Sequence, residues 1–376
     1  MVKAIRGLLT IVLGAGVISP AVSIAQHTTG TADVFVMTNN ADKNEVIAYE
    51  RTSDGNFIES HRYDTEGRGS GGTNDPLGAQ GSLTFSIDHS FLFAANAGSG
   101  TVSVFRVQRG ILSLADKEPS GGSEPVAVAQ RQNLVYVVDA AGSGNVAGFF
   151  LRNDGHLQPI QNSTTFLSAS GAGGASATIS PDGQFLAVTE RVANNIDVFR
   201  IQADGTLGQI VTNPSAGPGA FAARFAPDGK LLVSETGPAG AVNASAISSY
   251  SVLAGGTLSV ISQSVPTLGS ANCWNVITPD GARVYISNAA SSTISGFTIG
   301  KGGNLTPIGA TVVGSNPVGS GNLDIAISSD GKYIYTLNSA AGTIGVFAIQ
   351  PDGTLNNVDE IQGLPKSVGF NGIAAL

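Results

Sequence analysis

A β-branched residue followed three places later by an aromatic residue recurs seven times along this chain, and this repeat constrains the fold most strongly. A glycine follows each pair, and a leucine or phenylalanine stands two residues after that glycine. The pairs are Val46 and Tyr49, Val102 and Phe105, Val146 and Phe149, Ile196 and Phe199, Ile247 and Tyr250, Ile294 and Phe297, and Ile344 and Phe347. Chance does not place three such marks in register seven times, so the chain is an array of repeats of about 50 residues.

Each repeat has the pattern of four short strands. In the fourth repeat we predict strands over Ser176–Ser180, Gln184–Glu190, Asn195–Gln202 and Leu207–Thr212. Asp-Gly pairs at 182–183 and 204–205 separate the first strand from the second and the third from the fourth, and such pairs favour hairpins. Repeats of this kind predict an all-β fold, a seven-bladed β-propeller of four-stranded antiparallel blades.

The two ends of the chain predict how the ring closes. Asp33–Thr38, Glu45–Arg51 and Phe57–Tyr63 have the pattern of second, third and fourth strands, and no first strand precedes them. Gly369–Leu376 has the pattern of that missing strand. Pairing the last strand with the first blade removes two exposed sheet edges. We therefore expect residues 26–376 to form one closed domain.

Residues 1–25 have the pattern of a secretory signal. Lys3 and Arg6 precede the apolar run Leu8–Ile18, and Ser23–Ala25 supplies small residues for cleavage before Gln26. The apolar run is short for a membrane span. We expect an exported protein, periplasmic or extracellular, with no membrane span after cleavage. The alternative is an uncleaved membrane anchor.

Composition excludes several classes of site. Only 19 of 376 residues are Lys or Arg and the formal charge is −8, so the chain lacks the basic footprint of a nucleic-acid binder. The single cysteine, Cys273, allows neither an intrachain disulfide nor a cysteine-based zinc site. No glycine-rich loop leads into a helix, so nucleotide-binding fingerprints are absent. We expect a monomer.

The predicted topology separates two faces of the ring. The Asp-Gly turns, such as Asp182-Gly183, all lie on one face, which we call the turn face. Second strands end and first strands begin on the other, which we call the loop face and which also carries Gly67–Gly81. All seven second strands end in a polar residue, namely Asn39, Asn96, Asp139, Glu190, Glu235, Asn288 and Asn338. First-strand starts add Gln80, Glu124, Asn272, Asn322 and Asn371, with Asp324 nearby.

This polar ring predicts a ligand-binding mouth at the loop face. Glu190 and Glu235 are the candidate catalytic carboxylates, and Arg191 is the candidate catalytic cation. The candidate substrate-binding residues are Asn288, Asn275, Asn338, Asn96, Gln80 and Arg224, with Arg68 as a further anion contact. The alternative is that these side chains cap strand ends and bond loop backbone. We expect no cofactor; Ca²⁺ held by the ring oxygens is the alternative.

Nucleophilic catalysis has little support in the sequence. Of the four histidines, His27 is at the expected mature start and His61 in an outer strand. His89 and His156 lie in turns on the turn face. Cys273 begins an inner strand at the loop face without a histidine partner, so a Cys–His dyad is not predicted.

The blade motifs resemble a known family. Pro181-Asp182-Gly183, Phe185–Glu190 and Asn195–Phe199 are similar to the 6-phosphogluconolactonase-like seven-bladed propellers, a group that includes carboxymuconate-cyclising enzymes. The likeness extends over residues 31–376. The resemblance implies lactone hydrolysis or ring closure at the channel mouth by His, Arg and Glu residues. Glu190, Arg191 and Glu235 would carry the Glu and Arg roles, and the His has no counterpart on the loop face.

We therefore predict a lactonase-like hydrolase that opens a sugar, aryl or related lactone. Such a reaction needs a base for water, a donor for the developing oxyanion and a proton for the leaving alkoxide. Glu190 or Glu235 would be the base, and Arg191 with Asn288 or Asn275 would donate. The alternative is a non-catalytic exported propeller that binds a glycan or a protein through its loops.

Overall fold

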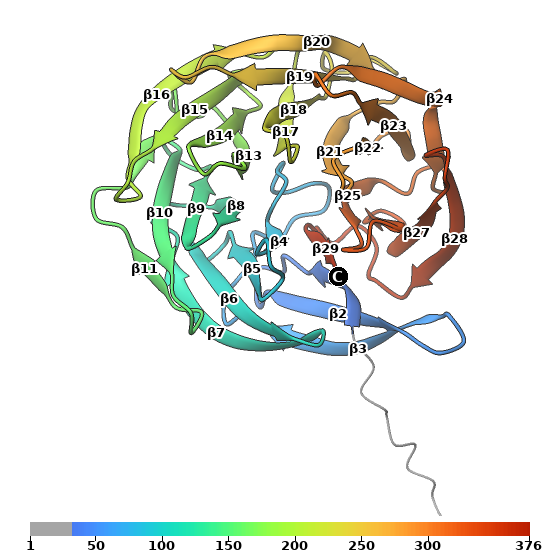
Figure 1. Ribbon diagram of the computed structural model, residues 1–376. Helices are drawn as coiled ribbons and strands as arrows, with labels where there is room; N and C mark the ends of the chain where they lie inside the picture. The colour runs from blue at the N-terminus through green and yellow to red at the C-terminus, as the bar shows by residue number, and fades with distance from the viewer. Residues whose placement is uncertain (1–31) are drawn as a thin grey trace, which may run out of the picture. The chain divides into compact units, whose positions relative to one another are not determined.

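Short antiparallel strands joined by tight turns make up the computed structural model, which describes residues 32–376. The predicted signal and Gln26 lie outside the described residues. Residues 32–376 form seven antiparallel sheets arranged as blades around one axis (Figure 1), which confirms the predicted β-propeller. Within this range no helix is long and apolar enough to cross a membrane.

The blades follow one another along the chain, and the strands of each blade run in order from the axis outwards. The first blade contains β29 (Ile373–Ala375), β1 (Ala32–Met37), β2 (Glu45–Arg51) and β3 (Phe57–Asp64). The second contains β4 (Leu83–Phe85), β5 (Phe91–Asn96), β6 (Thr101–Gln108) and β7 (Ile111–Pro119). The third contains β8 (Pro125–Arg131), β9 (Leu134–Asp139), β10 (Asn145–Leu151) and β11 (Leu157–Pro159), with β12 (Thr165–Phe166) also paired to β10.

The remaining blades have the same plan. The fourth contains β13 (Gly174–Ile179), β14 (Phe185–Glu190), β15 (Asn195–Ile201) and β16 (Leu207–Pro214). The fifth contains β17 (Ala220–Phe225), β18 (Lys230–Glu235), β19 (Ala246–Val252) and β20 (Leu258–Pro266). The sixth contains β21 (Asn272–Ile277), β22 (Arg283–Asn288), β23 (Thr293–Ile299) and β24 (Leu305–Ser315). The seventh contains β25 (Asn322–Ile327), β26 (Tyr333–Asn338), β27 (Thr343–Ile349) and β28 (Leu355–Gln362).

The sequence repeat has a physical cause in the packing between blades. The aromatic residue of each repeat lies in a third strand, and all seven are at most 2% exposed. The apolar clusters that contain them join neighbouring blades, as where Phe105 packs with Tyr136 of the next blade. Each blade buries the same apolar face against its neighbour, so each repeat needs the same large side chain there. The four predicted strands of the fourth blade are confirmed to within two residues at each end.

Ring closure follows the predicted pairing. The last strand, β29, pairs antiparallel with β1 through Val34 with Ala375, Phe35 with Ala374 and Val36 with Ile373. It stands where the first strand of the other blades stands, nearest the axis (Figure 1). The prediction that Gly369–Leu376 supplies the missing strand is therefore confirmed, with the regular strand limited to Ile373–Ala375.

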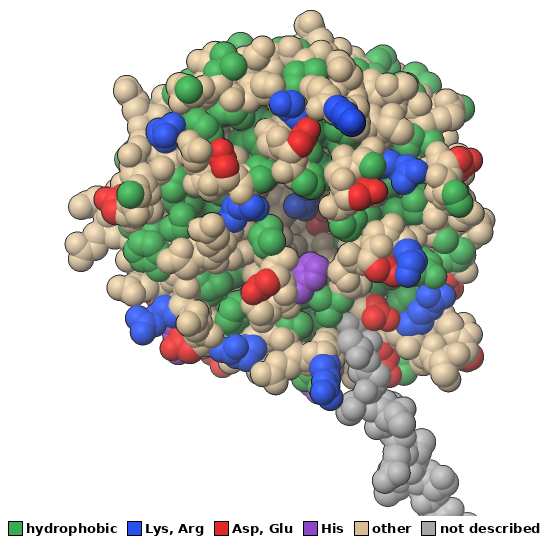
Figure 2. Space-filling model, viewed as in Figure 1, with side chains coloured by type: hydrophobic (Ala, Val, Ile, Leu, Met, Phe, Trp, Pro, Cys, Tyr) green, Lys and Arg blue, Asp and Glu red, His purple; other side chains and the backbone are tan. Residues whose placement is uncertain are grey.

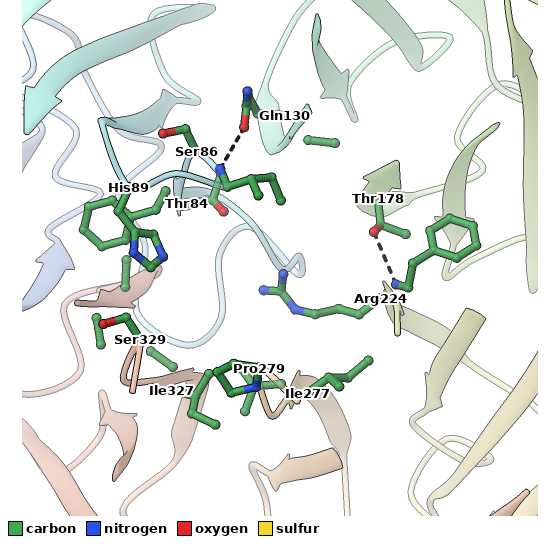
Figure 3. Close-up of a pocket in the computed structure, with 18 of the residues that line it drawn as sticks. Thr84, Ser86, His89, Gln130, Thr178, Arg224, Ile277, Pro279, Ile327 and Ser329 are labelled. Atoms are coloured by element: carbon green, nitrogen blue, oxygen red, sulfur yellow. Dashed lines mark hydrogen bonds between the residues drawn. The ribbon is translucent and has the colours of Figure 1, made fainter. Parts of the chain in front are cut away.

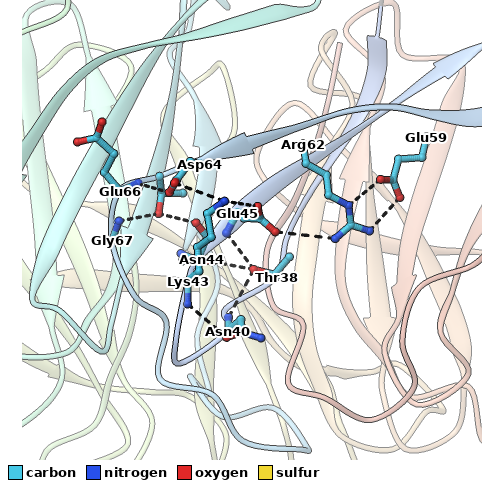
Figure 4. Close-up of polar contacts among 11 residues, drawn as sticks. Thr38, Asn40, Lys43, Asn44, Glu45, Glu59, Arg62, Asp64, Glu66 and Gly67 are labelled. Carbon is cyan, nitrogen blue, oxygen red and sulfur yellow. Dashed lines mark hydrogen bonds and ion pairs between the residues drawn. The ribbon is translucent and has the colours of Figure 1, made fainter.

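Buried polar side chains fasten the loop-face connections, as the first blade illustrates (Figure 4). The Asn44 amide oxygen accepts from the Asn39 backbone N–H at 2.9 Å, and its Nδ2 donates to Asn96 of the next blade at 3.0 Å. Around it lie exposed ion pairs, Lys43 with Glu45 at 2.8 Å and Arg62 with Glu59 at 2.6 Å (Figure 4). Exposed pairs of this kind contribute little to stability, whereas the buried amide satisfies backbone groups that water cannot reach.

Candidate functional site

A cavity of about 660 Å³ lies around the ring axis at the turn face. Its wall consists of the ends of the innermost strands β4, β8, β13, β17, β21, β25 and β29, with the turns that follow them (Figure 3). The space-filling view shows the hollow at the centre of the ring, with a histidine at its edge (Figure 2). Its volume suits a small-molecule ligand. The cavity thus lies at the opposite end of the channel from the predicted mouth.

The loop between β3 and β4 packs across the channel near the loop face. Its Ala79 carbonyl accepts from Trp274 Nε1 in the sixth blade at 2.9 Å, and its Gln80 N–H donates to Ala175 O in the fourth at 2.8 Å. Gln80 Nε2 also donates to Asn275 O at 2.9 Å. Leu77 and Ala79 are buried in the core. The glycine-rich segment Gly67–Gly81 therefore connects blades that are distant in the sequence.

Arg224 extends from β17 into the middle of the cavity (Figure 3). Its Nε donates to Asn275 O at 3.1 Å, the only hydrogen bond of this guanidinium within residues 32–376. Burial lowers the pKa of Arg224, and the Asp324 carboxylate opposes that shift. The terminal nitrogens are thus free to bind an anion or a polarised carbonyl oxygen. In four other blades the same position, four residues before the aspartate of the turn, carries Thr84, Thr178, Val276 and Ala326.

His89 points into the cavity from the β4–β5 turn, on the opposite side from Arg224 (Figure 3). Its ring packs edge-on against Phe85, with 5.4 Å between ring centroids. Burial lowers the pKa of His89, so its imidazole is neutral at neutral pH and has a nitrogen that can accept a proton.

His89 also has an unfavourable backbone conformation. Its φ is 57°, in the left-handed region. The equivalent residue of the turn in four other blades is a glycine with positive φ, namely Gly183, Gly229, Gly281 and Gly331. A non-glycine residue in this region costs about 1–2 kcal/mol. A histidine kept where glycine is preferred is a candidate functional residue, because strained positions cluster at functional sites.

Arg131 and Gln130 complete the polar part of the wall at the end of β8. Arg131 Nε is buried and has no hydrogen-bond partner within residues 32–376. Gln130 Oε1 accepts from the Ile87 backbone N–H at 2.9 Å, which fixes the β4–β5 turn beside it. The described wall therefore carries two guanidinium groups and one imidazole, with no Asp or Glu side chain among the residues lining it.

Nine of the ten predicted site residues, Arg68 among them, lie outside this cavity, and only Arg224 lines it. The amides cap strands and loops: Asn96 donates to Ser103 and Asn288 to Ser295, each at 2.8 Å. Asn338 donates to Asn316 at 3.0 Å, and Asn275 donates to Ser234 of the fifth blade at 2.9 Å. Gln80 belongs to the loop described above. The cited hydrogen bonds of these four asparagines run to other side chains of the protein, so the amides serve structural contacts at the loop face.

The two candidate catalytic glutamates, which the loop-face prediction places at a ligand-binding mouth, are fully buried. Glu235 Oε1 accepts from Ser248 at 2.6 Å and from the Gly217 N–H at 2.9 Å, and burial raises its pKa. Glu190 accepts from the backbone N–H and the hydroxyl of Ser168. Both carboxyl groups accept hydrogen bonds from the segments that connect neighbouring blades. Their catalytic roles stay a prediction.

Arg191 is exposed at the loop face and lies against Gly78, where an added Cβ would stand 2.9 Å from Nε. The charge of Arg191 acts on Asp75, whose carboxylate accepts from the Gly78 N–H and Asn371 Nδ2, each at 3.0 Å. Burial raises the pKa of Asp75 to about 6. Arg191 therefore lies over the loop that crosses the channel, and within residues 32–376 its side chain makes no hydrogen bond or ion pair with either glutamate. Among the described residues, no three His, Cys, Asp or Glu side chains group as a metal site.

Glu190 has a second carboxyl group beside it, that of Asp197, and both are fully buried. Asn96 with Ser103 and Asn288 with Ser295 have the same spacing as this pair, so two acids stand where other blades have an amide and a hydroxyl. Burial and the neighbouring Glu190 raise the pKa of Asp197 well above its ordinary value. Asp197 is therefore protonated in the folded state at neutral pH.

Stability should consequently fall as pH rises from about 5 to 8. The folded state retains the Asp197 proton over a range where the unfolded state has lost it, so each pH unit costs up to about 1.4 kcal/mol. Asp197→Asn keeps the shape and stays neutral, so it should flatten this slope and raise stability at pH 8. Urea unfolding of both proteins at pH 5 and pH 8 gives their free energies of unfolding. An equal change with pH in the two proteins would contradict the protonation of Asp197 in the folded state.

The sequence contains a feature that singles out His89, but this residue lies on the turn face, whereas the site was predicted on the loop face. Comparing the five turns of equivalent pattern shows one residue, His89, that breaks an otherwise constant Asp-Gly pair. Arg224 is the one charged residue at its own repeat position, where the other four turns carry Thr, Val or Ala. Residues that depart from the repeat, compared on both faces, include this pair. Polar residues alone favour the loop face, where their side chains bond other parts of the protein.

Comparisons with known proteins agree with this architecture. Residues 34–165, 127–244 and 278–368 match the family model described as lactonase, seven-bladed β-propeller, and together span more than half of the chain. No curated protein matches the chain. A candidate 6-phosphogluconolactonase of Bacteroides uniformis is 20% identical with a TM-score of 0.67, and the match covers 91% of this chain and 99% of that one.

Two further solved structures have similar scores. A periplasmic gluconolactonase of Pseudomonas aeruginosa is 18% identical with a TM-score of 0.66, covering 91% of this chain and 99% of that one. A candidate 6-phosphogluconolactonase of Bacteroides fragilis is 18% identical with a TM-score of 0.65, covering 92% and 99%. Identities this low show a shared fold.

Proposed function

The chain belongs to the seven-bladed β-propeller lactonase family, and from this premise we propose that it opens a lactone ring by hydrolysis in the turn-face cavity. The observation that carries the proposal is the pair formed by Arg224 and His89. A cation with free terminal nitrogens and a neutral imidazole point into one cavity from opposite sides (Figure 3). The family supplies the reaction class, and the pair supplies groups suited to it.

Each group has a defined part in the proposed reaction. His89 takes a proton from water, and the water oxygen attacks the lactone carbonyl carbon. The Nη–H groups of Arg224 donate to the carbonyl oxygen as it becomes an oxyanion. When the ring C–O bond breaks, the leaving alkoxide takes the proton from His89. The product is a hydroxy acid, and its carboxylate pairs with Arg224 until release.

The wall around the pair supports the same roles. Ile277 and Ile327 line the cavity together with Arg224, and apolar neighbours strengthen the interaction between a guanidinium and an oxyanion. Asp324 lies buried beneath, where its carboxylate accepts from the Ile325 N–H at 2.8 Å and the Ile373 N–H at 3.1 Å. Burial raises the pKa of Asp324 to about 7, so it only partly neutralises Arg224 near neutral pH.

Arg224→Met tests the proposal. Methionine keeps length and loses the charge, so kcat for the best lactone should fall about 10²–10³-fold. Arg224→Lys restores the charge without the planar fork and should recover part of the loss. The assay is hydrolysis of a panel of sugar, aryl and acyl-homoserine lactones, run with and without a chelator so that the calcium alternative is tested.

Arg191→Met and the double variant Glu190→Gln with Glu235→Gln are the matched controls, because they test the loop-face alternative. If the reaction takes place in the turn-face cavity, both control variants should retain the kcat of the parent protein. Full activity of Arg224→Met combined with loss of activity in the controls would move the reaction to the loop face.

Binding without catalysis is the second candidate function, and one observation favours it. Several loops of the loop face expose apolar side chains, among them Val192 at 65%, Val242 at 78% and Val318 at 101%. A protein or glycan could bind these loops while the cavity serves no reaction. Absence of turnover with every lactone of the panel would favour this candidate.

Export forms part of the proposal. The charged start, apolar run and small residues before Gln26 support a secretory signal. The Pseudomonas protein, a periplasmic gluconolactonase, has the same fold. We therefore place the proposed substrate outside the cytoplasm.

A further inference from the structure

An apolar ring surrounds the polar pair in the cavity wall. The residue three places before the aspartate of the turn is large and apolar in five blades, and all five line the cavity: Phe85, Ile179, Phe225, Ile277 and Ile327. Pro181, Pro227 and Pro279 extend this surface outwards along the turns. Figure 3 shows Ile277, Ile327 and Pro279 on the same side of the wall as one another, below the Arg224 guanidinium.

Several of the hydroxyl groups in the wall are already engaged in hydrogen bonds with the protein. Thr178 Oγ1 accepts from the Phe225 N–H at 3.4 Å, and Ser86 Oγ donates to Asp88 at 2.7 Å. Thr278 and Ser328 donate in the same way to Asp280 and Asp330 of their own turns. No carboxylate among the described lining residues faces the cavity. The wall therefore offers a ligand both an apolar ring and polar groups, and Arg224, Arg131 and His89 are its basic side chains.

This distribution discriminates between classes of lactone. A sugar lactone carries several hydroxyl groups, and each one buried without a partner lowers affinity. An alkyl or aryl substituent instead gains free energy for every methylene removed from water. The apolar ring thus favours ligands with an apolar body and one anionic or carbonyl end over polyhydroxylated ligands.

We propose that the substrates are lactones with an alkyl or aryl substituent, bound with the substituent against Phe225, Ile277 and Ile327 and the carbonyl at Arg224. The products are amphiphilic hydroxy acids, held by the same contacts. This inference rests on the proposed function, because it names the substrate class of that site.

A homologous series of γ-lactones tests the inference. From γ-butyrolactone to γ-octalactone, kcat/KM should rise about fourfold for each methylene buried, which is on the order of 10²-fold over the series. Glucono-δ-lactone should be a poorer substrate than γ-octalactone. Ile327→Ser should reduce the ratio of kcat/KM for γ-octalactone to that for γ-butyrolactone by about tenfold. Val318→Ser, at a fully exposed valine of the loop face, is the matched control and should leave that ratio unchanged.

Calorimetry with the product class separates failure of the inference from failure of the proposed function. 4-Hydroxyoctanoate should bind and gluconate should not, in the protein as purified. Binding of 4-hydroxyoctanoate without turnover of any lactone would support the ligand class and overturn the hydrolysis. Faster turnover of glucono-δ-lactone than of γ-octalactone would support the hydrolysis and overturn the ligand class. Binding of neither acid would overturn the inference. Ile277→Ser provides a second cavity variant if Ile327→Ser fails to fold.

Discussion

Replacing His89 by glycine should lower lactone turnover by about 10²–10⁴-fold while leaving the protein at least as stable as the parent. The rate falls because the imidazole is the proposed base. The fold does not suffer, because glycine adopts a φ of 57° without strain and is the residue at the same place in four other blades. Steady-state kinetics and thermal melting of the same preparation give the two quantities.

The rate and the melting temperature together distinguish a catalytic role of His89 from a structural one. A purely structural residue whose removal abolishes activity also lowers the melting temperature, whereas this substitution should not. His89→Asn tolerates the same backbone and lacks the base, so it should match the glycine variant in rate. His156→Gln, in an exposed turn, is the control and should keep full activity. Undiminished turnover in His89→Gly would remove the imidazole from the mechanism.

Deleting Gly369–Leu376 should abolish cooperative folding. The deletion removes β29, which pairs with β1 through three residue pairs and buries Phe370, Ile373, Ala374 and Ala375 to 6% exposure or less. It also leaves Asp324 without the Ile373 N–H and exposes the inner edge of β1. Circular dichroism on heating should show no sharp transition.

Removing Leu376 alone is the matched control for that deletion. The three pairs between β1 and β29 then remain, and only the hydrogen bond from the Leu376 N–H to Asp33 O at 2.9 Å is lost. The melting temperature should fall by a few degrees at most. A sharp transition within a few degrees of the full chain after the eight-residue deletion would show that β29 is not needed to close the ring.

The repeat determines the fold because its marks report local and neighbouring contacts. The third-strand aromatic residue, the Asp-Gly turn and the alternation of apolar residues each depend on positions a few residues away or on the next blade, so they repeat with the blade. The closing strand is predictable for the same reason, since the first blade lacks one strand and Gly369–Leu376 matches its pattern. These features needed no knowledge of the distant structure.

The position of the site depends on which residues of distant blades come together, and the repeat does not specify this. Arg224 and His89 are separated by 135 positions and belong to different blades, and only closure of the ring brings them to one cavity. Polarity at the second-strand ends predicted a mouth at the loop face, but Glu190, Glu235 and the asparagines are buried against loop backbone. A polar residue has the same letter whether it binds a ligand or satisfies a buried carbonyl, and only the tertiary structure shows which atoms face it.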